Sequence, residues 1–109
     1  MNASFTAKIL RNIKNGDVRI SEHGYDELAK DDLRVEEIFA DVGNAKMIEE
    51  YPEYPKGHCA LFLQSDQYEQ PIHTVWGIPE GFSKPAVLVT AYRPEPKKWN
   101  ENFTKRRKQ

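Results

Sequence analysis

The first half of the chain carries apolar residues at the spacing that one face of an α-helix requires. The clearest example is residues 35–42, whose apolar side chains fall at positions i, i+3, i+4 and i+7. Helices are also predicted over residues 4–14 and from Ser21, a residue type that caps helix N-termini, to Asp31. Between these two helices, residues 18–21 alternate apolar and polar side chains and predict a brief strand.

Beyond residue 45 the pattern changes from helical spacing to the alternation of β-strands. Strands are predicted over residues 46–51, 59–64, 72–77 and 86–92. Proline residues in the loops between them cannot donate to a β-ladder and therefore limit the strands. The last strand is almost wholly apolar, which is typical of a central strand buried on both faces.

These elements predict an α+β fold, with N-terminal helices packed on one face of a mostly antiparallel sheet of four to five strands. The four late strands form an antiparallel meander, and the early strand joins the same sheet through a two-helix crossover. Alternation along the strand 72–77 places His73 on the opposite face from Ile72, Thr74 and Trp76.

The chain has 109 residues, which is the length of a single domain. We assign residues 1–99 to this domain and residues 100–109 to a basic C-terminal tail. The net charge of −1 is unevenly distributed, because residues 1–92 hold 9 Lys and Arg against 15 Asp and Glu, whereas residues 93–109 hold 7 against 2. An acidic body argues against a uniformly basic nucleic-acid binder.

Several functional classes lack their sequence signatures. The single cysteine, Cys59, allows no internal disulfide, and the chain has no long apolar run and no signal-peptide pattern, so we expect a cytoplasmic protein. There is no CxxC pair and no HExxH, so no metal site is expected. There is also no glycine-rich phosphate loop and no GxSxG elbow, and we expect no cofactor.

Two histidines are candidates for acid–base chemistry. His23 lies in the first turn of its helix, where the helix dipole disfavours a positive charge and leaves a neutral imidazole suited to a general base. The alternative is a histidine that caps the helix or packs on the sheet. His73 lies in mid-strand beside apolar residues and is either a core histidine bonded to backbone or a ring presented on the open face of the sheet.

The end of the last strand gathers polar side chains. Thr90 and Tyr92 share one face, and Arg93 follows them with a planar guanidinium that suits phosphate. The alternative is a tyrosine held by backbone and an arginine paired with a nearby acid.

Four short segments occur in an order that resembles a known family: residues 19–24 (RISEHG), 48–52 (IEEYP), 71–76 (PIHTVW) and 89–94 (VTAYRP), with Trp99 shortly after. Together they look like a small bacterial and archaeal family labelled a domain of unknown function. That family resembles the RelE-like toxins of type II toxin–antitoxin systems, including the BrnT-like and MqsR-like branches. The resemblance runs from about residue 5 to about residue 99.

The resemblance implies a RelE-like fold and metal-independent RNA cleavage, with RNA as substrate and an antitoxin of the zinc-finger type as partner. On the positions that match, it implies that His23 and His73 act as acid and base and that Arg93 binds phosphate, while Thr90 and Tyr92 orient the reacting groups. Since the basic segment begins directly after Tyr92, RNA contacts are expected there as well, at Lys97 and Lys98.

Two alternatives remain open. The first is a non-catalytic protein-interaction module on the same scaffold, which the acidic body favours. The second is a small-ligand pocket lined by Tyr51, Trp76 and Tyr92.

Overall fold

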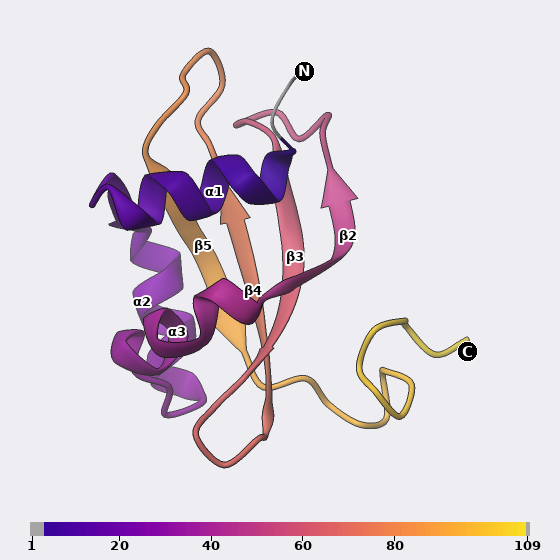
Figure 1. Cartoon of the computed structure of the whole chain (residues 1–109). Helices are drawn as coiled ribbons and strands as arrows, with labels where there is room; N and C mark the ends of the chain where they lie inside the picture. Colours follow the sequence, from indigo (N-terminus) through magenta and orange to yellow (C-terminus); the bar gives the residue numbers. More distant parts are fainter. Residues whose placement is uncertain (1–3, 109) are drawn as a thin grey trace.

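The computed structural model describes residues 4–108. Within this range the N-terminal part contains the helices α1 (Phe5–Lys14), α2 (Glu22–Lys30) and α3 (Val35–Asp41), the short strand β1 (Val18–Ile20) and a 3₁₀ turn (Val42–Asn44). The strands β2 (Lys46–Tyr51), β3 (Cys59–Ser65), β4 (Pro71–Gly77) and β5 (Ala86–Tyr92) follow (Figure 1). The predicted elements agree with these to within one or two residues at each end. None of the helices in this range is long and apolar enough to cross a membrane.

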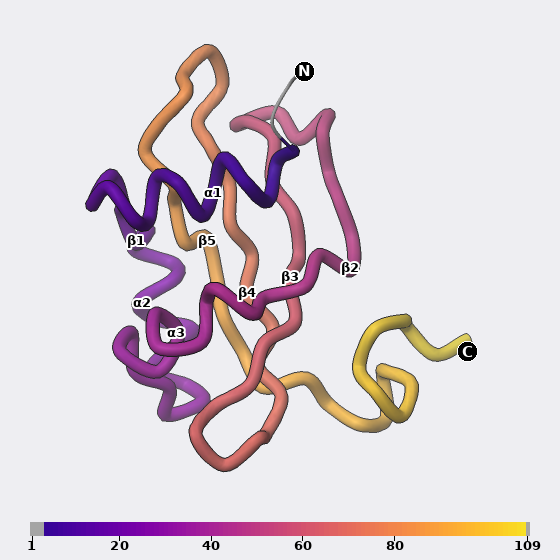
Figure 2. The backbone as a smooth tube through the Cα atoms, viewed as in Figure 1, coloured from indigo at the N-terminus to yellow at the C-terminus, as the bar shows by residue number. Residues whose placement is uncertain are grey.

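The strands form one mixed sheet in the order β1-β5-β4-β3-β2. The last four strands are an antiparallel meander, and β1 pairs in parallel with β5. The segment that leads from β1 to the meander contains α2 and α3, as the predicted crossover requires. The fold class is therefore α+β, with the helices packed on the sheet (Figure 2).

Two serines begin the first two helices. The side chain of Ser4 accepts a hydrogen bond from Ala7 N at 3.1 Å, and that of Ser21 accepts one from Gly24 N at 2.9 Å. The Ser21 hydroxyl also donates to the backbone oxygen of Val89 at 2.9 Å, which ties the start of α2 to β5. A Cβ on Gly24 would lie 2.8 Å from the Leu88 oxygen, so glycine permits this close approach.

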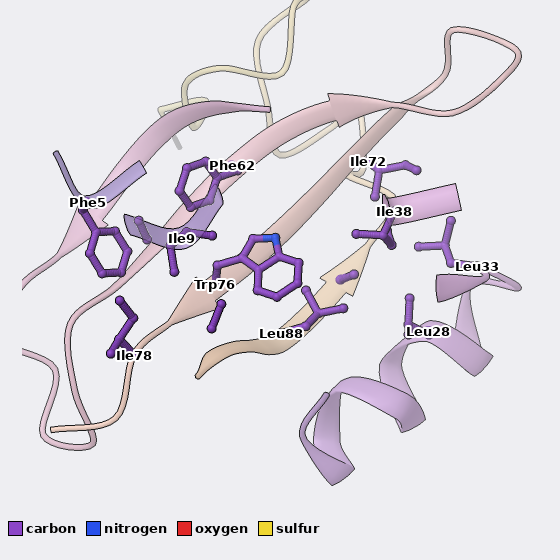
Figure 3. Close-up of a cluster of buried hydrophobic side chains, with 13 residues drawn as sticks. Phe5, Ile9, Leu28, Leu33, Ile38, Phe62, Ile72, Trp76, Ile78 and Leu88 are labelled. Carbon is purple, nitrogen blue, oxygen red and sulfur yellow. The ribbon is translucent and has the colours of Figure 1, made fainter. Parts of the chain in front are cut away.

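The main hydrophobic core lies between the helices and one face of the sheet. Figure 3 shows Phe62, Trp76 and Leu88 of the sheet together with Ile9 of α1 and Ile38 of α3. Each of these side chains is at most 2% exposed. The alternation predicted for residues 72–77 is confirmed, since Ile72, Thr74 and Trp76 are buried on the helix side of the sheet.

The chain after β5 returns to the face of the sheet opposite the helices, here called the open face. It runs from the end of β5 toward β2 (Figures 1 and 2). Residues 100–108, which we expected to be a tail, form a turn in which Trp99 and Arg106 are bridge partners. The Asn100 Oδ1 atom stabilises this turn because it accepts hydrogen bonds from Thr104 N and Lys105 N. Gln109 lies outside the described residues.

Candidate functional site

One end of the open face is hollowed, and we call this feature the basic hollow. Its volume is about 430 Å³, and its floor is formed by Cys59, Gly77, Val87 and Val89. Gly77 lies between Cys59 and Val87 in the register of β3, β4 and β5. Because glycine has no side chain, the floor is low at its centre, and a Cβ there would lie 3.1 Å from the Cys59 Cβ.

Cationic and polar groups surround this floor. Arg19, His23 and Lys56 line the hollow together with Ser21 and Tyr54, and the lining contains no carboxylate. Among residues 4–108, neither Arg19 nor Lys56 takes part in an ion pair. Positive charge that is not neutralised by protein carboxylates, above an apolar floor, is an arrangement that attracts an anion.

His23 presents its imidazole at the edge of the hollow. Its side chain is 65% exposed, and its Nε2 atom lies 3.9 Å from Glu27, one helical turn further along α2. The ring is positioned by the Ser21 cap, which begins the helix beside β5. The imidazole is therefore free to meet a ligand in the hollow.

The other end of the open face carries a closed group of aromatic side chains around His73, here called the His73 cluster. The His73 Nδ1 atom lies 3.2 Å from the Tyr92 hydroxyl, and its Nε2 atom lies 2.8 Å from the backbone oxygen of Phe103. Because a carbonyl oxygen only accepts, Nε2 carries the proton and Nδ1 accepts from Tyr92. The Trp99 ring stands edge-on to His73, with centroids 4.4 Å apart. His73 is 0% exposed, and burial lowers its pKa, so the ring is held neutral.

A carboxylate on β2 joins the same cluster. Glu49 accepts two hydrogen bonds from the Arg106 guanidinium, at 2.9 and 3.1 Å, and a third from the Tyr51 hydroxyl. Burial opposes ionisation of Glu49, but the bonds from Arg106 and Tyr51 hold its pKa below the usual value. Burial and the Glu49 carboxylate together raise the pKa of Tyr51 to about 12. The Arg106 guanidinium also lies over the Trp99 ring, 4.8 Å from its centroid.

Comparison with known proteins places this chain in a family. Residues 20–93 match the family model described as a domain of unknown function, DUF4258. The chain belongs to the DUF4258 family. The matched region contains His23, His73 and Tyr92 and ends before Trp99 and Arg106. No match was found among curated proteins or among solved structures.

The predicted catalytic residues of this DUF4258 protein lie in two places. His73 and Tyr92 are in contact in the His73 cluster, whereas His23 lies at the basic hollow. The three side chains therefore do not form one group. The separation follows from the topology, because α2 begins beside the middle of β5, while His73 pairs with Tyr92 at the far end of that strand.

The predicted RNA-binding residues are also dispersed. The Arg93 guanidinium lies 2.8 Å from the Asp66 carboxylate in the turn between β3 and β4, as the acid-paired alternative described. Thr90 lies opposite Val75 on the open face. Lys97 and Lys98 are exposed, and Lys98 lies 3.8 Å from Glu95.

The small-ligand alternative is wrong as a single pocket. Trp76 is buried in the core on the helix side of the sheet, whereas Tyr51 contacts Glu49 and Tyr92 contacts His73 on the open face. Strand alternation separates them, because Trp76 is an odd number of residues from His73 on β4. Within residues 4–108, no three metal-ligating side chains are grouped to hold a metal ion.

Sequence reasoning missed Arg19, Lys56, Glu49 and Arg106. Arg19 had a usable signal, because it stands between Val18 and Ile20 in a strand and must point away from the core. Lys56, Glu49 and Arg106 carry no such signal in the sequence. A lysine in a loop and a glutamate on an edge strand are common on any protein surface. Arg106 stands in a run of four consecutive basic residues that look alike in the sequence.

Proposed function

We propose that this protein is a metal-independent, toxin-like endoribonuclease whose RNA site is the basic hollow. One observation carries the proposal: Arg19, Lys56 and the exposed imidazole of His23 surround the same hollow, and no carboxylate lines it. An RNA phosphate needs cations at the phosphorus and a base beside the ribose, and this set offers both. The family resemblance found in the sequence supports the same activity.

The proposed chemistry is an internal transfer at one phosphate. His23 takes the proton from the ribose 2′-hydroxyl, and the 2′-oxygen forms a bond to phosphorus as the bond to the 5′-oxygen breaks. The leaving oxygen receives a proton from water or from the imidazolium, and the products are a 2′,3′-cyclic phosphate and a free 5′-hydroxyl. Arg19 and Lys56 neutralise the charge that develops on the phosphorane.

His73 and Tyr92 are not assigned to the catalytic site in this proposal. Both nitrogens of His73 already have hydrogen-bond partners, and the ring is completely buried beneath Trp99 and Phe103. A base needs access to the proton that it removes. We therefore assign the base to His23 and not to His73.

The test is cleavage of a fluorescent single-stranded RNA in the presence of EDTA, with mass spectrometry of the ends. His23→Gln should reduce cleavage by about 100-fold or more, the range for loss of a general base. Arg19→Gln and Lys56→Gln should weaken RNA binding and reduce its salt dependence. Arg11→Gln on the exposed side of α1 is the matched control and should change neither property.

Two results would refute the proposal. One is the absence of cleavage and of a growth defect on expression of the folded wild-type protein. The other is RNA binding that depends on Lys97 and Lys98 and is indifferent to Arg19 and Lys56. If the toxin-like function holds, the expected protein partner is an antitoxin of the zinc-finger type that blocks the open face.

A second candidate function is a non-catalytic interaction module. The observation that favours it is the occupied state of the His73 cluster, where a peptide segment already binds the sheet. This function predicts a stable protein partner whose binding tolerates His23→Gln. An endoribonuclease predicts that the same substitution abolishes the growth defect.

A further inference from the structure

The segment of residues 94–108, here called the C-terminal cover, holds the open face through three specific contacts. Trp99 packs edge-on against His73 with centroids 4.4 Å apart. The backbone oxygen of Phe103 accepts a hydrogen bond from His73 Nε2 at 2.8 Å. Arg106 forms a two-pronged bond with Glu49 at 2.9 and 3.1 Å. An aromatic ring, a carbonyl and a guanidinium thus each meet a complementary group on the sheet.

The C-terminal cover also has hydrogen bonds between its own residues. Arg107 N donates to the Lys98 oxygen and Asn100 N donates to the Lys105 oxygen, both at 2.9 Å. The Asn100 side chain accepts from Thr104 N at 2.9 Å. A turn that satisfies its own backbone in this way can leave the sheet without exposing many unpaired groups.

The cover contributes nothing to the main hydrophobic core. Trp99 is 3% exposed but lies outside the core cluster, whereas Phe5 and Ile9 of α1 belong to it. Both α1 and the cover lie outside the DUF4258 match, which spans residues 20–93. The two flanking segments therefore differ, because α1 completes the main core whereas the cover packs on the opposite face of the sheet.

Charge favours the contact as well. Residues 94–108 hold six Lys and Arg against two Glu, while residues 1–92 carry a net charge of −6. Arg106 fixes the position of the cover on the sheet, because its planar guanidinium binds the Glu49 carboxylate and also stacks on Trp99.

We propose that the His73 cluster is a peptide-recognition site and that the C-terminal cover is its detachable intramolecular ligand. The site selects a turn-forming basic peptide with an aromatic residue and an arginine seven positions apart. His73 and Tyr92 supply the aromatic contact, the His73 N–H binds a backbone carbonyl, and Glu49 binds the guanidinium. Bound, the cover shields His73 and Tyr92; released, it exposes both. The inference does not depend on RNA cleavage.

The test uses charge reversal in the full-length chain. Arg106→Glu places a carboxylate against Glu49 and should release the cover, while Glu49→Arg combined with Arg106→Glu restores an ion pair and should close it again. Lys108→Glu is the matched control, because the exposed Lys108 side chain forms no ion pair among residues 4–108. The readout is residue-resolved modification of His73 by diethyl pyrocarbonate, measured by mass spectrometry.

We expect His73 to react at least tenfold faster in Arg106→Glu than in the wild type, and at the wild-type rate in Lys108→Glu and in the double reversal. A synthetic peptide of residues 94–108, added to the Arg106→Glu protein, should protect His73 again. The same peptide with glutamate at position 106 should not protect it. Amide hydrogen exchange in β3 and β4 should remain slow in every variant.

Three outcomes would overturn the proposal. In the first, Arg106→Glu and Trp99→Ala both leave His73 protected, so these contacts do not hold the cover. In the second, either variant loses amide protection throughout β3 and β4, which makes the segment an integral part of the fold. In the third, His73 is exposed in Arg106→Glu but the wild-type peptide does not protect it, so the surface does not recognise a peptide.

Discussion

Replacement of His73 by phenylalanine tests the account of the His73 cluster in quantitative terms. Phenylalanine keeps a ring of similar size but can neither donate to the Phe103 oxygen nor accept from the Tyr92 hydroxyl. Each of these groups then loses its partner in a partly buried setting, at about 1–3 kcal/mol apiece. Since the added hydrophobic area offsets part of this loss, we expect His73→Phe to lower the free energy of unfolding by about 2–4 kcal/mol.

The same substitution removes a pH dependence whose sign follows from the structure. Burial lowers the pKa of folded His73 below the ordinary value of about 6.5; the hydrogen bond to the Phe103 oxygen and the Glu49 carboxylate oppose this change, and Arg106 adds to it. Between the lowered pKa of folded His73 and pH 6.5, the unfolded chain therefore binds a proton at this residue that the folded chain does not bind. The contribution of neutral His73 to the free energy of unfolding is therefore complete above pH 6.5. It declines as the pH falls toward the folded pKa, by at most about 1.4 kcal/mol per pH unit.

The assay is urea denaturation followed by circular dichroism at several values between pH 7.5 and 5. The Glu49 and Asp66 carboxylates, whose folded pKa values are lowered, lose their contribution mainly below pH 5, which is under the range of this assay. The wild type should lose stability on acidification, and His73→Phe should lose less. A variant with the wild-type slope, or a wild type that gains stability at pH 5, would refute the assignment of a buried neutral histidine.

Three further substitutions test other parts of the structure. Gly24→Ala should destabilise the protein in thermal melts despite a gain in helix propensity of about 1 kcal/mol, because the new Cβ would lie 2.8 Å from the Leu88 oxygen; a stabilised variant would contradict this. Asp66→Ala should lower the free energy of unfolding, measured by urea titration, by about 2–4 kcal/mol, because the 2%-exposed carboxylate binds Tyr68 N, Gln70 N and Arg93. A decrease below about 0.5 kcal/mol would show that the turn is stable without this carboxylate. Arg19→Gln should lower the slope of log affinity against log salt for single-stranded RNA by about 0.7, and an unchanged slope would remove Arg19 from the RNA site.

Much of the fold follows from short-range patterns in the sequence. The i, i+3, i+4, i+7 spacing in residues 35–42 identifies α3, and the serine at position 21 marks the start of α2. Alternation along β4 assigns Trp76 to the core and His73 to the other face. These features are readable because each depends on neighbours within about one helical turn or a few strand residues.

The two proposed sites depend on residues that are far apart in the chain. Glu49 and Arg106 are separated by 57 positions, and neither differs in the sequence from other acidic or basic residues nearby. The same holds for the hollow, which requires Arg19, Lys56 and Gly77 from β1, a loop and β4. The resemblance identified the family region that contains His23 and His73, but not that the two are separated.

The sequence by itself therefore determined the helices and strands to within one or two residues, the opposite faces of Trp76 and His73 on β4, and the membership of the DUF4258 family. The tertiary structure alone decided that a basic C-terminal segment lies over His73 and that Arg19, Lys56 and the His23 imidazole surround one hollow. The physical reason is the separation along the chain of the residues that interact. Periodicity and capping are properties of adjacent residues, whereas an ion pair or a hollow exists only after the sheet has brought distant strands together.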